Sequence, residues 1–196
     1  MRSLLRDGSS DEQIGIVAEK TIFEKPRSHR FWRGPGGRSG KLKRCQKLED
    51  EAMGKVLAVC ISEKKGTQKK NIQEAEFIED FGIEKDAHAG KWHRQVSLLS
   101  YEKIEDFRNR GAEVADGAFG ENLVVSGFDF KNLPIGTRFR CNDVVLELTQ
   151  IGKECHHGCE IFQKMGDCIM PREGVFTKVL HGGRIKVGDE MVIEEA

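Results

Sequence analysis

The chain of 196 residues, in which 32 Lys and Arg balance 32 Asp and Glu, has room for one domain and some additional sequence. Because the charges cancel, no overall field indicates a nucleic-acid or membrane partner. The longest apolar run, residues 56–61, is far shorter than the roughly 20 residues of a membrane span, and the first residues lack the apolar stretch of a secretory signal. Six unevenly spaced cysteines are typical of cytosolic thiols rather than of a disulfide framework, which predicts a cytoplasmic protein.

Residues 1–52 differ in composition from the rest of the chain. They hold 12 Lys and Arg against 8 Asp and Glu, and the stretch PRSHRFWRGPGGRSGKLKRC is rich in Gly and Arg without an apolar period. Such a segment cannot bury enough apolar surface to offset its ordering entropy. We therefore predict a poorly ordered basic extension over 1–52 and a folded domain over 53–196. A phosphate-binding arm, with Phe31 and Trp32 between its arginines, and a remnant of an adjoining domain are the alternatives.

From residue 53 the pattern is mostly that of strands. GKVLAVCIS (54–62) and QVSLL (95–99) are apolar runs with β-branched residues, which predict buried strands. Ser100 is then expected to cap an amphipathic helix, SYEKIEDFRNRG, which buries Ile104 and Phe107 and ends at Gly111.

The second half of the domain predicts further short strands, separated by Gly, Pro and Asn turns. These are ENLVVSG (121–127), GTRFRC (136–141), DVVLELTQI (143–151), GVFTKVL (174–180), GRIKV (183–187) and DEMVIEE (189–195). Many short strands with small turns are typical of a closed barrel, because closure removes exposed edges. The predicted fold class is therefore mainly β, a barrel with a few short helices.

The stretch GKECHHGCEIFQKMGDC (152–168) gathers three cysteines and two histidines. A structural zinc site usually takes ligands from two short-spaced pairs, and the spacing of Cys155, Cys159, Cys168 and His181 matches no recognised finger. A lasting Cys155–Cys159 disulfide would require local distortion and a non-reducing compartment. Three ordinary buried thiols are another alternative, although Gly152 and Gly158 on either side of Cys155 disfavour a rigid core position.

A reactive thiol fits the stretch better. Cys155 follows the predicted strand 143–151 directly, at a position that exposes side chains at the rim of a barrel. The start of a following helix, Lys153 and the neighbouring histidines would favour its thiolate. Cys159 and Cys168 are candidate helper thiols, able to release a transferred group by disulfide formation.

Two further stretches carry polar residues beside glycine. KDAHAGKWHRQ (85–95) holds His88 and Arg94 just before a strand, as either a solvated loop or an anion-binding rim, where Arg supplies a planar two-toothed donor. GAFGENLVVSG (117–127) places Glu121 and Asn122 after two glycines, as either a turn or a source of ligand contacts.

Taken together, several stretches resemble the MOSC domain, found at the C-terminus of molybdenum cofactor sulfurases and in small stand-alone proteins. The matching stretches are GIEKDAHAG (82–90), RQVSLLS (94–100), GAFGENLVVSG (117–127), LPIGTRFRC (133–141) and TQIGKEC (149–155). The likeness covers residues 53–196. One departure is Lys85, which stands where the family often has Gly before Asp86.

The resemblance implies a β-rich barrel and a role in sulfur or molybdenum cofactor chemistry, as a sulfurtransferase or a molybdenum cofactor-linked protein. It implies that Cys155 carries persulfide sulfur. A partner cysteine desulfurase, which itself holds the pyridoxal phosphate, would supply that sulfur, and a molybdenum cofactor or another metal–sulfur centre would accept it. His88, Arg94, Glu121 and Asn122 would bind molybdopterin, the anionic pterin cofactor. The alternatives are a molybdopterin-binding accessory or reductase module without a persulfide cycle, in which Cys155 is a molybdenum ligand, and a zinc-stabilised structural domain.

Overall fold

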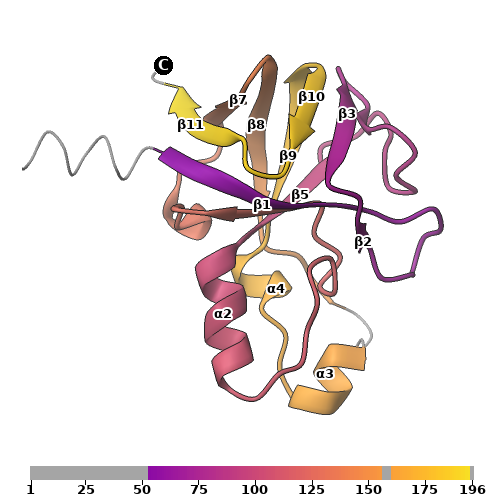
Figure 1. Ribbon diagram of the computed structural model, residues 1–196, viewed down its shortest axis with the longest axis vertical. Helices are drawn as coiled ribbons and strands as arrows, with labels where there is room; N and C mark the ends of the chain where they lie inside the picture. The colour runs from indigo at the N-terminus through magenta and orange to yellow at the C-terminus, as the bar shows by residue number, and fades with distance from the viewer. Residues whose placement is uncertain (1–52, 156–159, 195–196) are drawn as a thin grey trace, which may run out of the picture. The chain divides into compact units, whose positions relative to one another are not determined.

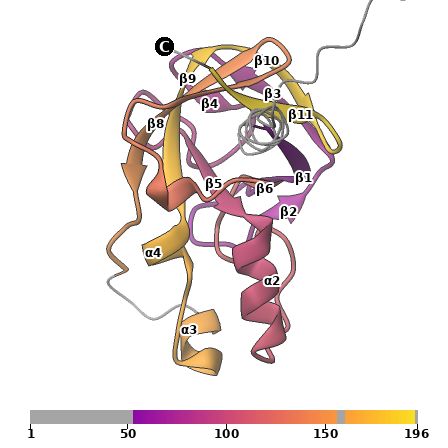
Figure 2. The same cartoon turned by 90° about the vertical axis from the view of Figure 1, so that its left-hand side faces the viewer.

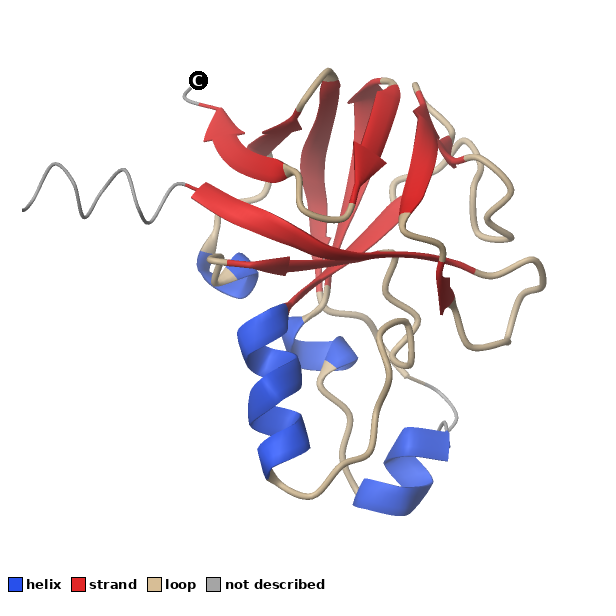
Figure 3. Cartoon of the chain, in the orientation of Figure 1, coloured by secondary structure: helices blue, strands red, loops and turns tan. Residues whose placement is uncertain are grey.

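A closed barrel of seven strands forms the centre of the fold. In this computed structural model, which describes residues 53–155 and 160–194, the strands follow one another around the barrel and β11 pairs with β1 to close it (Figures 1 and 3). In order around the barrel they are β11 (Glu190–Glu194), β7 (Arg138–Cys141), β8 (Val144–Ile151), β9 (Val175–His181), β5 (Val96–Ser100), β6 (Leu123–Ser126) and β1 (Met53–Ile61). The predicted barrel is thereby confirmed.

Strand β1 is long enough to pair with both of its barrel neighbours, β11 and β6, and with a third strand outside the barrel. Its first residues pair with β11, and its register with β6 shifts between Val56 and Ala58. Gly54 lies at the crowded start, where a Cβ atom would overlap the Ser126 carbonyl and the Phe128 ring. A bulge increases the local twist of a strand, which helps β1 to close the barrel.

Outside the barrel, a small sheet and short β2 complete the strands of the described residues. β10 (Gly183–Lys186), β3 (Glu74–Ile78) and β4 (Gly82–Ile83) form the small sheet, and β2 (Lys70–Asn71) pairs with the end of β1. Ala75 and Phe77 of β3 point inward between exposed residues, the alternation expected of a half-buried strand.

Helix α2 (Tyr101–Asn109) connects β5 to β6, which run parallel and therefore need a crossover. The predicted helix and its buried residues, Ile104 and Phe107, are confirmed. Ser100 occupies the N-cap position, but its hydroxyl donates to Oε2 of Glu102 at 2.6 Å instead of capping a backbone N–H. The remaining short helices are η1 (Phe130–Asn132), α3 (Glu160–Met165) and α4 (Met170–Glu173).

The core has two parts, one inside the barrel and one beneath the helices. Inside, the rings of Phe128, Phe130 and Phe139 lie 5.4 to 5.8 Å apart among the inward residues of the strands. Beneath α2 and α4, Phe107 meets Phe119 edge to face at 5.4 Å. Helices α2, α3 and α4 lie on the same side of the barrel (Figure 2).

The predicted extension over residues 1–52 lies outside the described residues, as do His156, His157, Gly158 and Cys159. Among the helices that are described, none is long and apolar enough to cross a membrane.

Candidate functional site

The chain leaves strand β8 through a close contact with helix α4. The Gly152 N–H donates to the Gly174 carbonyl at 2.7 Å. Gly152 has a φ of +67°, and a Cβ atom there would overlap the carbonyl oxygen of Pro171. Only glycine takes this backbone conformation at this separation without strain. The exit of β8 is therefore held against α4, and the residues that follow it project beside the helices.

Cys155 is exposed at this position and lines a cavity of about 690 Å³. Cys168, which is 6% exposed, lines the same cavity. A second cavity, of about 540 Å³, is also lined by both cysteines. Of the three thiols singled out in the sequence, the structure thus brings Cys155 and Cys168 to shared cavity walls, whereas Cys159 lies outside the described residues.

The larger cavity is lined mainly by apolar side chains, with a few charged residues among them. Lys153 lies two residues from Cys155, and Lys164 of α3 is paired with Glu160 at 2.6 Å. The apolar side chains come from the loop between α2 and β6, from α3 and from α4: Ala112, Val114, Ala115, Ala118, Phe119, Ile161, Met165 and Met170. Glu113 and Glu160 balance Lys153 and Lys164 on this lining, which therefore suits a ligand or a partner segment with an apolar body.

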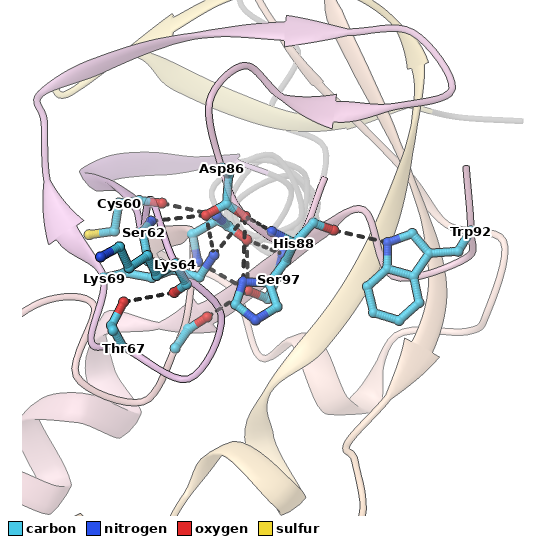
Figure 4. Close-up of polar contacts among 11 residues, drawn as sticks. Cys60, Ser62, Lys64, Thr67, Lys69, Asp86, His88, Trp92 and Ser97 are labelled. Atoms are coloured by element: carbon cyan, nitrogen blue, oxygen red, sulfur yellow. Dashed lines mark hydrogen bonds and ion pairs between the residues drawn. The ribbon is translucent and has the colours of Figure 1, made fainter. Parts of the chain in front are cut away.

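Beneath the loop 85–95, a buried ion pair joins Lys69 to Asp86 (Figure 4). Lys69 Nζ donates to both carboxylate oxygens, at 2.7 and 2.8 Å, and the Ser62 N–H donates to Oδ1 at 3.0 Å. Burial raises the pKa of Asp86, but these hydrogen bonds outweigh burial and hold that pKa below its ordinary value. For Lys69, burial outweighs the carboxylate and lowers the pKa of the amine.

Lys85 keeps the turn before Asp86 although it replaces glycine. Its φ is +63°, in the left-handed region that glycine adopts most readily. The Asp86 carboxylate reaches Lys69 with this backbone conformation, which costs more for lysine than for glycine.

His88 lies above this pair with its Nδ1 3.9 Å from Asp86 Oδ2. Within the described part of the chain, that buried Nδ1 has no hydrogen-bond partner. Burial and the charge of Lys69 lower the pKa of His88, and Lys65 and Lys153 contribute in the same direction. At neutral pH His88 is therefore an uncharged ring beside the Lys69–Asp86 ion pair.

Arg94 is held between two aromatic rings. Its guanidinium carbon lies 4.9 Å from the centre of the Trp92 ring and 5.5 Å from that of Phe176. Its Nε atom is buried, with no hydrogen-bond partner among residues 53–155 and 160–194. Stacking on these rings restrains the plane of the guanidinium, and the buried Nε is a polar group that has lost its contact with water without gaining a hydrogen bond to any residue that the structure describes.

Glu121 and Asn122 are placed differently from the other predicted binding residues. Glu121 is fully buried and accepts the N–H groups of Gly117 and Phe119 at 2.7 and 3.0 Å. Burial raises its pKa to about 7. Its carboxylate thus holds the glycine-rich turn that lines the larger cavity, behind the residues that face that cavity.

The Asn122 side chain joins three neighbouring strands. Oδ1 accepts from the N–H and the hydroxyl of Ser97 at 3.1 and 2.9 Å, and Nδ2 donates to the Cys60 carbonyl at 2.9 Å. The amide is therefore engaged within the protein.

A zinc site of the predicted kind finds no support in the described residues, where no group of three or more His, Cys, Asp and Glu side chains is arranged to hold a metal ion. His181, one of the suggested ligands, instead contacts the Asp143 carbonyl through Nδ1 at 2.7 Å. The sequence did not indicate that Lys69 is buried, because its neighbours Lys64, Lys65 and Lys70 are exposed and no apolar pattern surrounds it.

The model of the MOSC domain family matches residues 85–192, and the chain belongs to this family. The matched segment contains Asp86, His88, Arg94 and both cavity cysteines. A search of curated proteins finds no match.

Solved structures share the fold at low sequence identity. The YUAD protein from Bacillus subtilis is 20% identical with a TM-score of 0.63, and the match covers 74% of this chain and 97% of that one. YiiM from Geobacillus stearothermophilus is 17% identical with a TM-score of 0.56, over 72% of this chain and 75% of that one. At these identities the similarity establishes the fold alone.

Proposed function

We propose that this MOSC domain is a sulfur carrier that handles the molybdenum cofactor, or another metal–sulfur centre, through Cys155. The observation that carries the proposal is an exposed thiol at the end of β8, on a cavity wall that also holds Lys153. A carrier thiol must be reachable by a donor and by an acceptor in turn. Cys155 meets this condition, whereas Cys60 is buried beneath the helices and Cys141 inside the barrel.

The loading step is a thiol exchange without net oxidation. The Cys155 thiolate attacks the terminal sulfur of a persulfide on a partner cysteine desulfurase. The sulfur–sulfur bond of the donor breaks, its cysteine leaves as a thiolate, and Cys155 becomes a persulfide. Pyridoxal phosphate acts only on the partner, where it releases the sulfur from free cysteine.

Two buried polar atoms without hydrogen-bond partners in the described chain support binding of an anionic cofactor nearby. Arg94 Nε and His88 Nδ1 lack partners among the described residues, and His88 is influenced by Lys69 and by the opposing Asp86 carboxylate, with smaller effects of Lys65 and Lys153. Unpaired buried polar atoms are costly, so a phosphate or similar group of molybdopterin at this place would satisfy them. When bound, that cofactor would supply a molybdenum centre able to accept sulfur. Glu121 and Asn122 would support the site from behind rather than contact it.

A second candidate function is a molybdopterin-binding module without a persulfide cycle, with Cys155 as a metal ligand. The same two buried atoms, Arg94 Nε and His88 Nδ1, favour this function. The two functions predict different behaviour of Cys155 in the absence of cofactor. A carrier thiol accepts sulfur from the desulfurase, whereas a thiol that serves only as a metal ligand does not.

The test is to incubate the purified protein with a cysteine desulfurase and cysteine, then map the sulfur by peptide mass spectrometry. The carrier function predicts a gain of about 32 Da on Cys155 and none in Cys155→Ser. Cys60 and Cys141 are internal controls, because burial raises the pKa of each thiol to about 12 and leaves almost no thiolate. Protein that gains no sulfur on Cys155, yet retains pterin, would favour the second candidate.

A further inference from the structure

We propose that Cys168 is the resolving thiol of this site, which attacks the Cys155 persulfide, forms a Cys155–Cys168 disulfide and releases hydrosulfide. The proposal rests on the sulfur-carrier function and adds to it the route by which sulfur leaves the protein. The primary observation is that Cys155 and Cys168 both line each of the two neighbouring cavities.

The backbone brings the two thiols together through one close contact. Gly152 precedes Cys155 by three residues and contacts Pro171, which follows Cys168 by three residues. The Gly152 N–H also bonds to the Gly174 carbonyl at 2.7 Å. Three residues of extended chain span about 10 Å at most, so both cysteines lie on short tethers from a fixed point. A disulfide needs Cα atoms about 4.4 to 6.8 Å apart, a separation that such tethers can reach.

The two thiols differ in accessibility in the order that the reaction requires. Cys155 is exposed and can meet a desulfurase. Cys168 is 6% exposed and packs in the apolar cluster with Phe119, Ile169 and Met170. A bulky donor therefore reaches Cys155 first, and Cys168 can act only on sulfur that is already bound to this chain.

The residue before Cys168 fixes its position. Asp167 Oδ1 accepts the Cys168 N–H at 2.8 Å, and both carboxylate oxygens bind Arg172, at 2.8 and 3.0 Å. Arg110, just beyond α2, binds the same carboxylate at 3.0 Å. Two guanidinium groups thus hold the turn that carries Cys168 between α2 and α4, which keeps this thiol at the wall that it shares with Cys155.

The step balances in atoms and electrons. Cys168 loses its proton to solvent and its thiolate attacks Sγ of the Cys155 persulfide. The bond from that Sγ to the outer sulfur breaks, and the outer sulfur leaves as hydrosulfide with the bonding electron pair. The sulfane sulfur is reduced, the two cysteines are oxidised to a disulfide, and an external dithiol must reduce that disulfide before the next cycle.

The experiment loads the full-length protein with persulfide, removes the donor and follows sulfide release without reductant. Wild type should release about one sulfide per chain while its mass falls to about 2 Da below that of the reduced protein. Cys168→Ala should keep the persulfide and slow release at least about tenfold. Cys141→Ala is the matched control, because it removes a buried thiol from the barrel, and it should release sulfide as wild type does.

Several results would overturn the proposal while leaving the carrier function intact. Wild type could hold its persulfide stably, or Cys168→Ala could release sulfide at the wild-type rate. Loss of release in Cys159→Ser but not in Cys168→Ala would assign the step to Cys159.

A second measurement does not depend on persulfide loading. Oxidation of the reduced protein with diamide should give a Cys155–Cys168 peptide cross-link. Its absence would contradict the pairing, whereas its presence in a protein that takes up no persulfide would mean that the carrier function, and not the pairing, is wrong.

Discussion

Lys69 Nζ lies 2.7 and 2.8 Å from the two carboxylate oxygens of Asp86, and both side chains are almost completely buried. This ion pair fixes the start of the loop that carries His88 and Arg94. The loop therefore rests on a charged contact inside the fold, beneath the predicted anion-binding residues.

The first prediction concerns this pair. Lys69→Met should lower the free energy of unfolding by about 3–5 kcal/mol, because it leaves the Asp86 carboxylate buried without its partner. Combining Lys69→Met with Asp86→Leu should cost less than the sum of the two single changes. Urea denaturation of the four proteins measures both effects.

A matched control is the exposed pair of Glu84 and Lys85, 3.9 Å apart with side chains 51% and 77% exposed. Glu84→Gln should change stability by no more than about 0.5 kcal/mol. If Glu84→Gln lowered the free energy of unfolding as much as Lys69→Met does, the stabilising role of the buried Lys69–Asp86 pair would be contradicted.

The second prediction is a pH dependence from Glu121. Its pKa in the folded protein, about 7, lies above the ordinary value of 4.5. Between pH 4.5 and 7, Glu121 therefore keeps a proton in the folded state that it has lost in the unfolded state. The associated stability is fully present below about pH 4.5 and is lost as pH rises through 7, by up to about 3 kcal/mol.

The contribution of Glu121 to the pH dependence of stability can be isolated by comparing the unfolding free energies of wild type and Glu121→Gln at several pH values. The variant should show a smaller decline between pH 4.5 and 7 than wild type. Parallel curves for the two proteins would show that Glu121 does not titrate in this range.

The third prediction tests the contact that positions the cysteines. Gly152→Ala should destabilise the protein by more than about 2 kcal/mol, because the new methyl group meets the Pro171 carbonyl in addition to the strain of a positive φ. It should also slow release of sulfide from the persulfide form. Gly66→Ala is the control, since Gly66 has a φ of +79° with open space around it, and should cost only about 1 kcal/mol.

The fourth prediction concerns Arg94. Arg94→Gln should reduce retention of an oxidised-pterin fluorescence signal by about tenfold or more, because it removes a charged donor stacked on Trp92 and Phe176. Arg138, which is exposed on β7 and lies 3.6 Å from Glu147, provides the control Arg138→Gln. Equal retention in both variants would remove Arg94 from the cofactor site.

Much of the barrel was predictable because its strands carry continuous apolar runs. The runs at 54–62, 143–151 and 174–180 became β1, β8 and β9. β2 and β4 are only two residues each, and β3 carries two glutamates in five residues. β2 pairs with β1, and β3 pairs with both β10 and β4. These tertiary contacts rather than local propensity decide the pairing, which is why the sequence did not reveal these strands.

The candidate site was predictable only in part. Strand and glycine signals placed Cys155 at the end of β8, as observed. The proximity of Cys168 depends on the approach of Gly152 to Pro171, which is a tertiary contact. Glu121 and Asn122 are residue types that often bind ligands, which is why the sequence suggested them. Their burial and their hydrogen bonds to the backbone arise only in the folded chain and could not be predicted from the sequence.

The most direct test of the account is where sulfur is found after the purified protein is incubated with a cysteine desulfurase and cysteine. Peptide mass spectrometry should show a gain of about 32 Da on Cys155, abolished in Cys155→Ser and absent from Cys60 and Cys141. No gain on Cys155, or an equal gain on the two buried cysteines, would contradict the assignment of Cys155 as the carrier thiol.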